Sequence, residues 1–227
     1  MTPSVAPRMH LPAIGFREAG VLGRSVVRVL RDSNRTGDII IAEEIAAQAQ
    51  LGHLLECGTF DSEEGRRLLR DRAELSDVDI DSLRAMSDGT LGRAFADHLD
   101  EHNLSYRLVN QPTPYTPDPD RAYLLRRLRH SHDIWHTLLG IGTRGHEEVL
   151  IHAFSLAQTG LPTSIAIVVL GAIKHMVLEQ RWSSLTPGLR RAYERGRRAA
   201  PLLSVYWEEH WTNPLDEVRA RYRVEPW

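Results

Sequence analysis

The residues of this chain with the most chemical capacity lie between His132 and Glu148. The segment His132-Asp133-x-x-His136 brings two imidazoles and a carboxylate close together, and Glu148 follows after eleven more residues. Because an α-helix turns by about 100° per residue, the side chains of His132, Asp133 and His136 fall within one arc of about 100°. Nitrogen and oxygen donors gathered in this way are typical of a divalent-metal site.

Glu148 has to reach the same place from a second helix. Gly140, Gly142 and Gly145 precede it, and glycine readily adopts the turn conformations that end a helix. A helix that returns after this glycine-rich turn would bring Glu148 beside the histidines. The donor set would suit zinc, iron or manganese, and two histidines with one carboxylate also match the facial triad of iron enzymes. A salt-bridged histidine cluster without metal is the alternative.

Other histidines and a group of arginines invite simpler interpretations. His98 and His102 repeat the His-x-x-x-His spacing, but acidic residues flank them, which favours a solvated helix face. Surface positions are expected for His130 and His146. Five arginines between residues 190 and 198 spread around a helix, so we expect a solvated surface there in preference to a phosphate-binding or membrane-binding patch.

Composition restricts the class of protein. Of 227 residues, 42% are hydrophobic and 26% charged, as in ordinary soluble globular proteins. The net charge of -2 offers no field for a polyanion, so no nucleic-acid partner is expected. The single cysteine, Cys57, excludes disulfides within the chain and a four-thiolate zinc site. The longest apolar run, Ile165 to Ile173, is about half the length of a bilayer span, and no secretory signal is recognised.

Helical signals dominate the chain, and no alternating strand pattern of any length occurs. We therefore expect an all-α, single-domain helical bundle with a metal site on two helices joined by a Gly-rich turn. Residues 1–36 would form an N-terminal arm that could be flexible, and residues 37–227 the domain. The nearly wholly apolar helix from Pro162 is expected at the centre of the core. The predicted helices are 38–57, 61–72, 79–86, 90–102, 119–140, 147–158 and 162–178, with two more that open at Thr186-Pro187 and Asn213-Pro214.

An ordered set of motifs resembles the ubiquinone (coenzyme Q) biosynthesis protein four family. Arg127-Leu128-Arg129 precedes the His132-Asp133-x-x-His136 and Glu148 pattern as in that family. The resemblance covers the chain from about residue 60 to its end. Glu147 stands where the family usually has glycine, and Ser87-Asp88 replaces a proline-containing start, which leaves the ligand positions unchanged. Further matching segments are Asp88-Gly89-Thr90-Leu91-Gly92, Asn103, Ala122-Tyr123, Gln158-Thr159-Gly160-Leu161-Pro162 and Trp207-Glu208.

The resemblance implies an all-α protein that holds a divalent metal, usually described as zinc, through His132, Asp133, His136 and Glu148. Such proteins contact the quinone-bearing membrane peripherally, bind polyprenylated benzoate or quinone precursors and organise the other ubiquinone-biosynthesis enzymes. The family is also credited with a lyase-type oxidative decarboxylation that replaces the carboxylate at ring carbon one of a polyprenyl hydroxybenzoate by hydroxyl.

Three functions follow as hypotheses. The first is this metal-dependent enzyme, with Glu148 as the carboxylate that moves protons while His132, Asp133 and His136 stay on the metal. The second is a non-catalytic lipid-binding scaffold in which the metal pins two helices together. The third is a His-Asp metal phosphohydrolase, which would need an aspartate on a later helix, and none precedes Asp216.

We expect the protein in a bacterial cytoplasm, peripheral to the inner membrane. Five arginines against one glutamate in residues 1–31 also suggest the matrix side of a mitochondrial inner membrane as the alternative. A homodimer is plausible.

Overall fold

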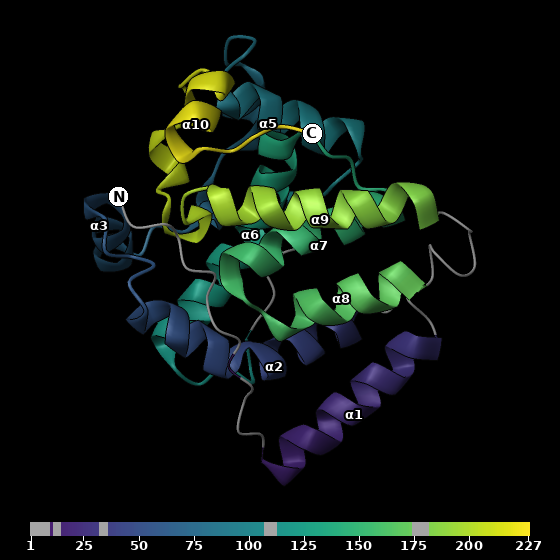
Figure 1. Ribbon diagram of the computed structural model, residues 1–227. Coiled ribbons are helices and arrows are strands. Elements are labelled where there is room, and N and C mark those ends of the chain that lie inside the picture. Colours follow the sequence, from purple (N-terminus) through teal and green to yellow (C-terminus); the bar gives the residue numbers. More distant parts are fainter. Residues whose placement is uncertain (1–9, 11–14, 32–35, 107–112, 174–181) are drawn as a thin grey trace.

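The computed structural model describes residue 10 and residues 15–31, 36–106, 113–173 and 182–227, and this part is helical (Figure 1). Within these ranges no strand occurs, and only an isolated bridge joins Thr90 to Pro214. The all-α prediction is confirmed. The helices are α1 (Phe16–Arg31), α2 (Thr36–Glu56), α3 (Glu63–Asp71), α4 (Ile80–Arg84), α5 (Leu91–Glu101), α6 (Pro119–Leu139), α7 (Gly145–Thr159), α8 (Pro162–Ile173), α9 (Trp182–Arg198) and α10 (Leu215–Tyr222), with short 3₁₀ turns η1 (Leu75–Asp77), η4 (Leu202–Ser204) and η5 (Trp207–Glu209).

The ends of the central helices follow the local sequence signals. Asp118 caps α6 by accepting hydrogen bonds from the N–H groups of Asp120 and Arg121, and Pro119 occupies the first helical position, where its missing N–H costs nothing. Gly140 ends α6 and Gly160 ends α7, both with positive φ. A left-handed residue at this position favours glycine, which explains why two long helices stop where they do.

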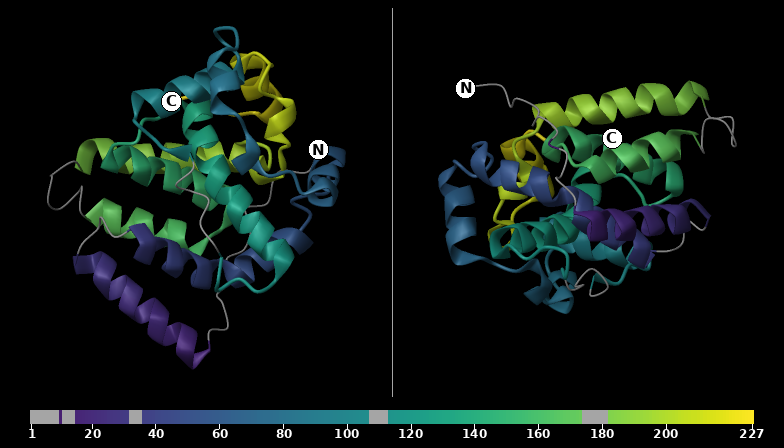
Figure 2. Two further views of the ribbon diagram at one scale, coloured as in Figure 1. Left: turned by 180° about the vertical axis from the view of Figure 1, so that it is seen from behind. Right: turned by 90° about the horizontal axis from the view of Figure 1, so that it is seen from below.

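The helices pack in a consecutive series. α7 packs on α9 and α8, α8 packs on α2, and α2 packs on α1 (Figure 1), whereas α6 packs on α5 and α2 (Figure 2). The buried apolar side chains of these helices form one continuous core, in which the Trp135 ring of α6 meets the Phe154 ring of α7 with centroids 6.1 Å apart. The helices that carry the candidate ligands are thus anchored in the core of the molecule.

The apolar helix α8 is not at the centre of this core, and the prediction for it is wrong. Ser164 is its only buried residue, while Val169, Leu170 and Ile173 are 49%, 45% and 54% exposed. Together with exposed Ala166, these residues recur three or four positions apart and so share one face. α8 packs against α7 and α2 with its other side. The predicted continuation of this helix to Leu178 lies outside the described residues.

The structure also shows a helix in the N-terminal arm and an earlier start for one predicted helix. The segment Phe16–Arg31 of the N-terminal arm forms α1, which packs along α2, and Ser25 of α1 donates a hydrogen bond to Asp38 of α2. α9 begins at Trp182, before the predicted start at Thr186, and it contains Pro187. None of the helices in the described part of the chain is long and apolar enough to cross a membrane.

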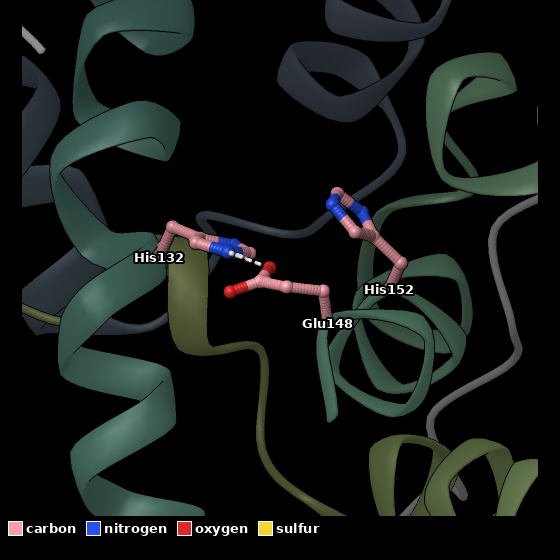
Figure 3. A group of neighbouring side chains, drawn as sticks. All are labelled: His132, Glu148 and His152. Carbon is pink, nitrogen blue, oxygen red and sulfur yellow. Dashed lines mark ion pairs between the residues drawn. The ribbon is translucent and has the colours of Figure 1, made fainter. Parts of the chain in front are cut away.

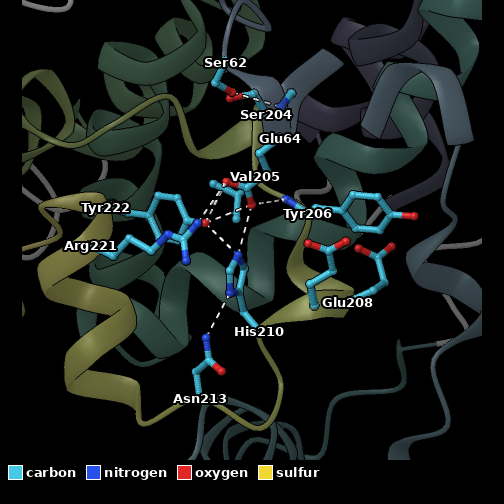
Figure 4. Close-up of polar contacts among 12 residues, drawn as sticks. Ser62, Glu64, Ser204, Val205, Tyr206, Glu208, His210, Asn213, Arg221 and Tyr222 are labelled. Carbon is cyan, nitrogen blue, oxygen red and sulfur yellow. Dashed lines mark hydrogen bonds and ion pairs between the residues drawn. The ribbon is translucent and has the colours of Figure 1, made fainter. Parts of the chain in front are cut away.

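Buried polar contacts hold the C-terminal region on the bundle (Figure 4). The Glu64 carboxylate of α3 accepts hydrogen bonds from the backbone N–H of Tyr206 at 2.9 Å, from His210 Nε2 at 3.0 Å and from the Tyr222 hydroxyl at 2.8 Å. Burial alone would raise the pKa of Glu64, but these hydrogen bonds lower it to about 2. A single carboxylate therefore connects three distant segments of the chain.

A buried arginine makes a second such connection. Arg127 of α6 is 1% exposed, and its guanidinium donates to both carboxylate oxygens of Glu208, at 2.5 and 2.8 Å. It also donates to the carbonyl oxygens of Val205 and Ala73, at 2.8 and 3.1 Å. The two motif segments 127–129 and 207–208 are thus direct partners, which fixes α6 against the C-terminal region.

Candidate metal centre

The turn between α6 and α7 sets the relative position of the candidate ligands. After Gly140, the Ile141 N–H donates to the His136 carbonyl oxygen, so the chain reverses immediately below His136. The Arg144 N–H donates to the Glu147 carboxylate at 2.9 Å, which starts α7. A Cβ at position 142 would come within 2.9 Å of the Glu147 carboxylate, so Gly142 allows this close approach. Glu147 thus has a structural role at the one position of this segment that departs from the family pattern.

The turn brings His132, His136 and Glu148 together. The Nε2 atoms of the two histidines are 3.2 Å apart. His132 Nε2 lies 3.5 Å from Oε2 of Glu148, and His136 Nε2 lies 3.5 Å from Oε1 of the same carboxylate. Two imidazole nitrogens that face one carboxylate are donors of the kind that a zinc-type ion binds.

The imidazole of His136 is held in the orientation that a metal ligand needs. Its side chain is completely buried, and Nδ1 lies 3.1 Å from the carbonyl oxygen of Ile141. Nδ1–H is then the donor to that oxygen, so the Nε2 lone pair faces His132 and Glu148. A backbone partner of this kind fixes both the tautomer and the ring plane of a ligating histidine.

The electrostatics of the three residues favour a cation among them. Burial opposes the charge of His132, but the hydrogen bond and charge of Glu148, with smaller effects of Asp133 and Glu43, raise its pKa above the usual value. Burial likewise opposes the charge of Glu148, yet the two histidines hold its pKa well below the usual range. The same contacts form the salt-bridged cluster that the sequence leaves as the alternative, and a metal would have to displace its protons.

Asp133 lies beside this group and does not contact it directly. Its half-buried carboxyl forms no hydrogen bond or ion pair with the described residues, although His132 and His136 act on it electrostatically. Burial is the largest effect on Asp133 and raises its pKa. Three of the four predicted donors therefore meet, and coordination by Asp133 stays a prediction.

His152 completes the group from a position that the sequence analysis did not single out (Figure 3). His132, Glu148 and His152 each have one potential ligand atom within 4.8 Å of the others. Burial, with the nearby positive charge of His132, lowers the pKa of His152 to about 3, so its imidazole is neutral. The sequence contains one indication that His152 lies near Glu148: the two residues are four apart, and residues with this spacing share one face of a helix.

The surface position expected for His130 is wrong, and His98 is half-buried against α6. The ring of His98 stacks on that of His136, with centroids 5.6 Å apart, and burial lowers the pKa of His98 to about 4. His130 is 1% exposed, and its Nδ1 lies 2.9 Å from the carbonyl oxygen of Arg126. His146 is half-buried near the start of α7. The contacts of His98 with His136 and of His130 with Tyr106 join residues far apart in the sequence, so the sequence around these histidines does not reveal them.

A cavity of about 540 Å³ opens beside the candidate ligands. It lies between α5 and the turn that follows α6, and its walls include His98, His102, His136 and Arg144. His136 therefore touches both the donor group and a space large enough for a small organic ligand.

Comparison with known proteins extends the resemblance over nearly the whole chain. The family described as "Coenzyme Q (ubiquinone) biosynthesis protein Coq4" matches residues 8–227. The mitochondrial ubiquinone biosynthesis protein COQ4 homolog of Danio rerio is 32% identical over 217 residues, which cover 95% of this chain and 79% of that protein. The mitochondrial COQ4 protein of Yarrowia lipolytica is 33% identical over 90% of this chain and 80% of its own length.

A solved structure shows the same fold. The crystal structure of a protein from Nostoc punctiforme, provisionally described as a ubiquinone biosynthesis protein, aligns with a TM-score of 0.73 over 91% of this chain and 98% of that chain, at 23% identity. The match of the family over residues 8–227, together with relatives that are more than 30% identical over most of their length, shows that this chain belongs to the coenzyme Q (ubiquinone) biosynthesis protein Coq4 family.

Proposed function

We propose that this protein is a metal-dependent enzyme of ubiquinone biosynthesis that replaces the ring carboxylate of a polyprenyl hydroxybenzoate by a hydroxyl group. The observation that carries the proposal is the meeting of His132, His136 and Glu148, of which His136 also lines the 540 Å³ cavity. Zinc is the expected ion, with iron or manganese as alternatives, and the ion would supply a positive charge that binds and polarises the ring carboxylate.

The reaction breaks the bond between ring carbon one and the carboxylate, which leaves as CO₂, and forms a bond to hydroxyl oxygen. This exchange is a two-electron oxidation of the ring, and dioxygen is the electron acceptor that we assign. The reaction balances when water supplies the hydroxyl oxygen and dioxygen takes up the two electrons and two protons as hydrogen peroxide. Zinc has no redox chemistry, so with zinc the electrons would pass directly from substrate to dioxygen.

Each residue of the centre would have its own role in this reaction. His132 and His136, with Asp133 as the further ligand predicted from the sequence, would hold the ion. Glu148 would accept and return the proton that moves when the phenolic oxygen forms, because its carboxylate also faces both imidazoles at 3.5 Å. His98 stacks on His136 and lines the cavity, where its neutral ring would contact the bound aromatic head group.

A non-catalytic scaffold is the second candidate, favoured by the way the helices pack. α7 packs mainly on α8 and α9, whereas α6 packs mainly on α2 and α5. A metal bound by both α6 and α7 would therefore join two groups of helices, which is a structural role. Other enzymes of ubiquinone biosynthesis are the partners that the family implies for either function.

We also propose peripheral contact with the membrane that carries the polyprenyl precursor. The exposed apolar face of α8, formed by Ala166, Val169, Leu170 and Ile173, supports this contact. A helix with one apolar face can lie in the interface of a bilayer without crossing it.

Replacement of Glu148 by glutamine tests the enzyme against the scaffold. We expect the purified wild-type protein to hold about one metal ion per chain, and Glu148→Gln to lose more than about 100-fold in turnover of a short-chain prenyl hydroxybenzoate while its helical circular dichroism persists. Glu217→Gln is the control, because this exposed glutamate of α10 lies outside both the metal centre and the lining of the cavity. Collapse of the helical signal in Glu148→Gln alone would support the scaffold, and wild-type protein that binds no metal would contradict both functions.

A further inference from the structure

We propose that His152 is a direct ligand of the metal in this protein, so that α7 contributes two ligands, Glu148 and His152. This inference rests on the proposed function only in that it requires the centre to bind a metal. It assigns a role to a histidine outside the His132-Asp133-x-x-His136 and Glu148 pattern.

The first argument for His152 as a ligand is the arrangement of donors on the two helices. His132 and His136 are four residues apart on α6, and Glu148 and His152 are four residues apart on α7. Residues with this spacing lie one above the other on a helix face. Figure 3 shows His132 extending from α6 while Glu148 and His152 extend from α7 toward it. Each helix thus presents a row of two donors to the other.

The second argument for His152 as a ligand is the set of distances. One donor atom from each of His132, Glu148 and His152 lies within 4.8 Å of the other two, and the His132 and His152 rings are 5.3 Å apart between centroids. An ion with bonds of about 2.1 Å holds its donors about 3.0 to 4.2 Å apart, depending on coordination number. The upper limit of 4.8 Å among the three donor atoms is close to this range.

The third argument for His152 as a ligand is the hydrogen-bond partner of its ring. Its Nδ1 lies 3.5 Å from the hydroxyl oxygen of Ser164, a buried residue of α8, and this is its one hydrogen-bond partner among the described residues. An Nδ1–H directed at Ser164 leaves the Nε2 lone pair for a metal, the arrangement that a ligating histidine generally has. The Ile141 carbonyl plays the same part for His136.

The assignment of His152 is independent of Asp133. The carboxyl of Asp133 makes no hydrogen bond or ion pair within the described residues, and its charge also acts on His130 and on the buried Tyr106. His152 would bind the ion together with Glu148 from α7, and replacement of Asp133 by asparagine tests the contribution of Asp133 separately.

Cobalt substitution gives a direct test that does not depend on activity. Each imidazole bound to paramagnetic Co²⁺ gives a strongly shifted ring N–H signal in the proton NMR spectrum, so the signals count the histidine ligands. We expect signals from three histidines in the wild-type protein and in Asp133→Asn, and from two in His152→Gln. We also expect His152→Gln to weaken Zn²⁺ binding by about 100-fold or more in competition with a chelator, since loss of even an outer partner costs about 10–100-fold.

The controls separate this inference from the metal centre itself. His53→Gln on α2 removes a histidine away from the centre and should change neither the signal count nor the Zn²⁺ affinity. Two signals in the wild-type protein, unchanged in His152→Gln and accompanied by unchanged Zn²⁺ affinity, would overturn the assignment of His152 while the metal centre stands. A wild-type protein that takes up neither Co²⁺ nor Zn²⁺ would overturn the centre, and the assignment with it.

Discussion

At the residue scale, two buried carboxylates show how a site of chemistry differs from a structural contact. Glu64 and Glu148 both have lowered pKa values because hydrogen bonds outweigh the cost of burial. The partners of Glu64 include a tyrosine hydroxyl and a backbone N–H, which are poor ligands for a metal. The partners of Glu148 are imidazole nitrogens, and a cavity opens beside His136. The nature of the partners, and not the pKa shift, makes Glu148 the candidate for function.

Glu64 should therefore govern stability against acid. Its pKa is about 2 in the folded protein and close to the ordinary value of 4.5 in the unfolded chain, so its contribution is present above about pH 4.5 and is lost as the pH falls toward 2. We expect Glu64→Gln to lower the free energy of unfolding by about 2–3 kcal/mol at pH 7, and the difference from wild type to shrink below pH 4. Urea unfolding at a series of pH values measures both quantities.

The neighbouring residue gives the control for this prediction. Glu63 is exposed in the first turn of the same helix, so Glu63→Gln should change stability by less than about 0.5 kcal/mol at any pH. A difference between Glu64→Gln and wild type that stays constant down to pH 2 would show that the carboxylate charge does not contribute.

At the element scale, the sequence predicts helix ends better than helix environments. Caps such as Asp118 and Gly140 are local, and the structure confirms them because the hydrogen bonds involved span only a few residues. The environment of α8 depends on which other helices cover it, and an apolar composition does not contain that information. The sequence does not reveal the position of His98 for the same reason, since its stacking on His136 arises from the packing of α5 on α6.

The same distinction between local signals and long-range packing applies to the candidate site. Helical periodicity places His132 and His136 together, and the glycine-rich turn makes the approach of Glu148 predictable. The participation of His152 depends on how α7 is rotated about its axis. That rotation is set by its packing between α8 and α9, which no single motif records.

The position of the centre between two groups of helices predicts where a metal stabilises the protein. A metal at about 100 times its dissociation constant should raise the free energy of unfolding by about 2.7 kcal/mol. We expect hydrogen exchange to slow on metal binding at the end of α6 and in the first turns of α7, and to stay unchanged in α4, which packs on α5 away from the ligands. Exchange by mass spectrometry with and without chelator measures this. If metal binding slowed hydrogen exchange equally in α4 and α7, the metal would stabilise the whole protein and not the region around the ligands.

At the scale of the whole molecule, charge and apolar surface give different indications about partners. The net charge of -2 gives no general attraction to an anionic surface. Three arginines on α9 have partners: Arg190 pairs with Glu194, Arg198 with Glu225, and the Arg195 guanidinium lies over the Trp227 ring. We therefore expect the proposed membrane contact to depend mainly on the exposed apolar face of α8.

We accordingly expect Val169→Glu/Leu170→Glu to abolish most binding to lipid vesicles. Both side chains are about half exposed, and burying their remaining apolar surface is worth about 1.5 to 3 kcal/mol together, so binding should fall by about 10-fold or more. Ser82→Glu/Ala85→Glu adds the same charge to exposed positions in and next to α4 and should leave binding unchanged. Co-sedimentation with vesicles of mixed neutral and anionic lipid measures the effect, and analytical ultracentrifugation of the same variants reports their oligomeric state. If wild-type protein ignores vesicles but forms a dimer that Val169→Glu/Leu170→Glu dissociates, the face of α8 binds a second copy of the chain and not a membrane.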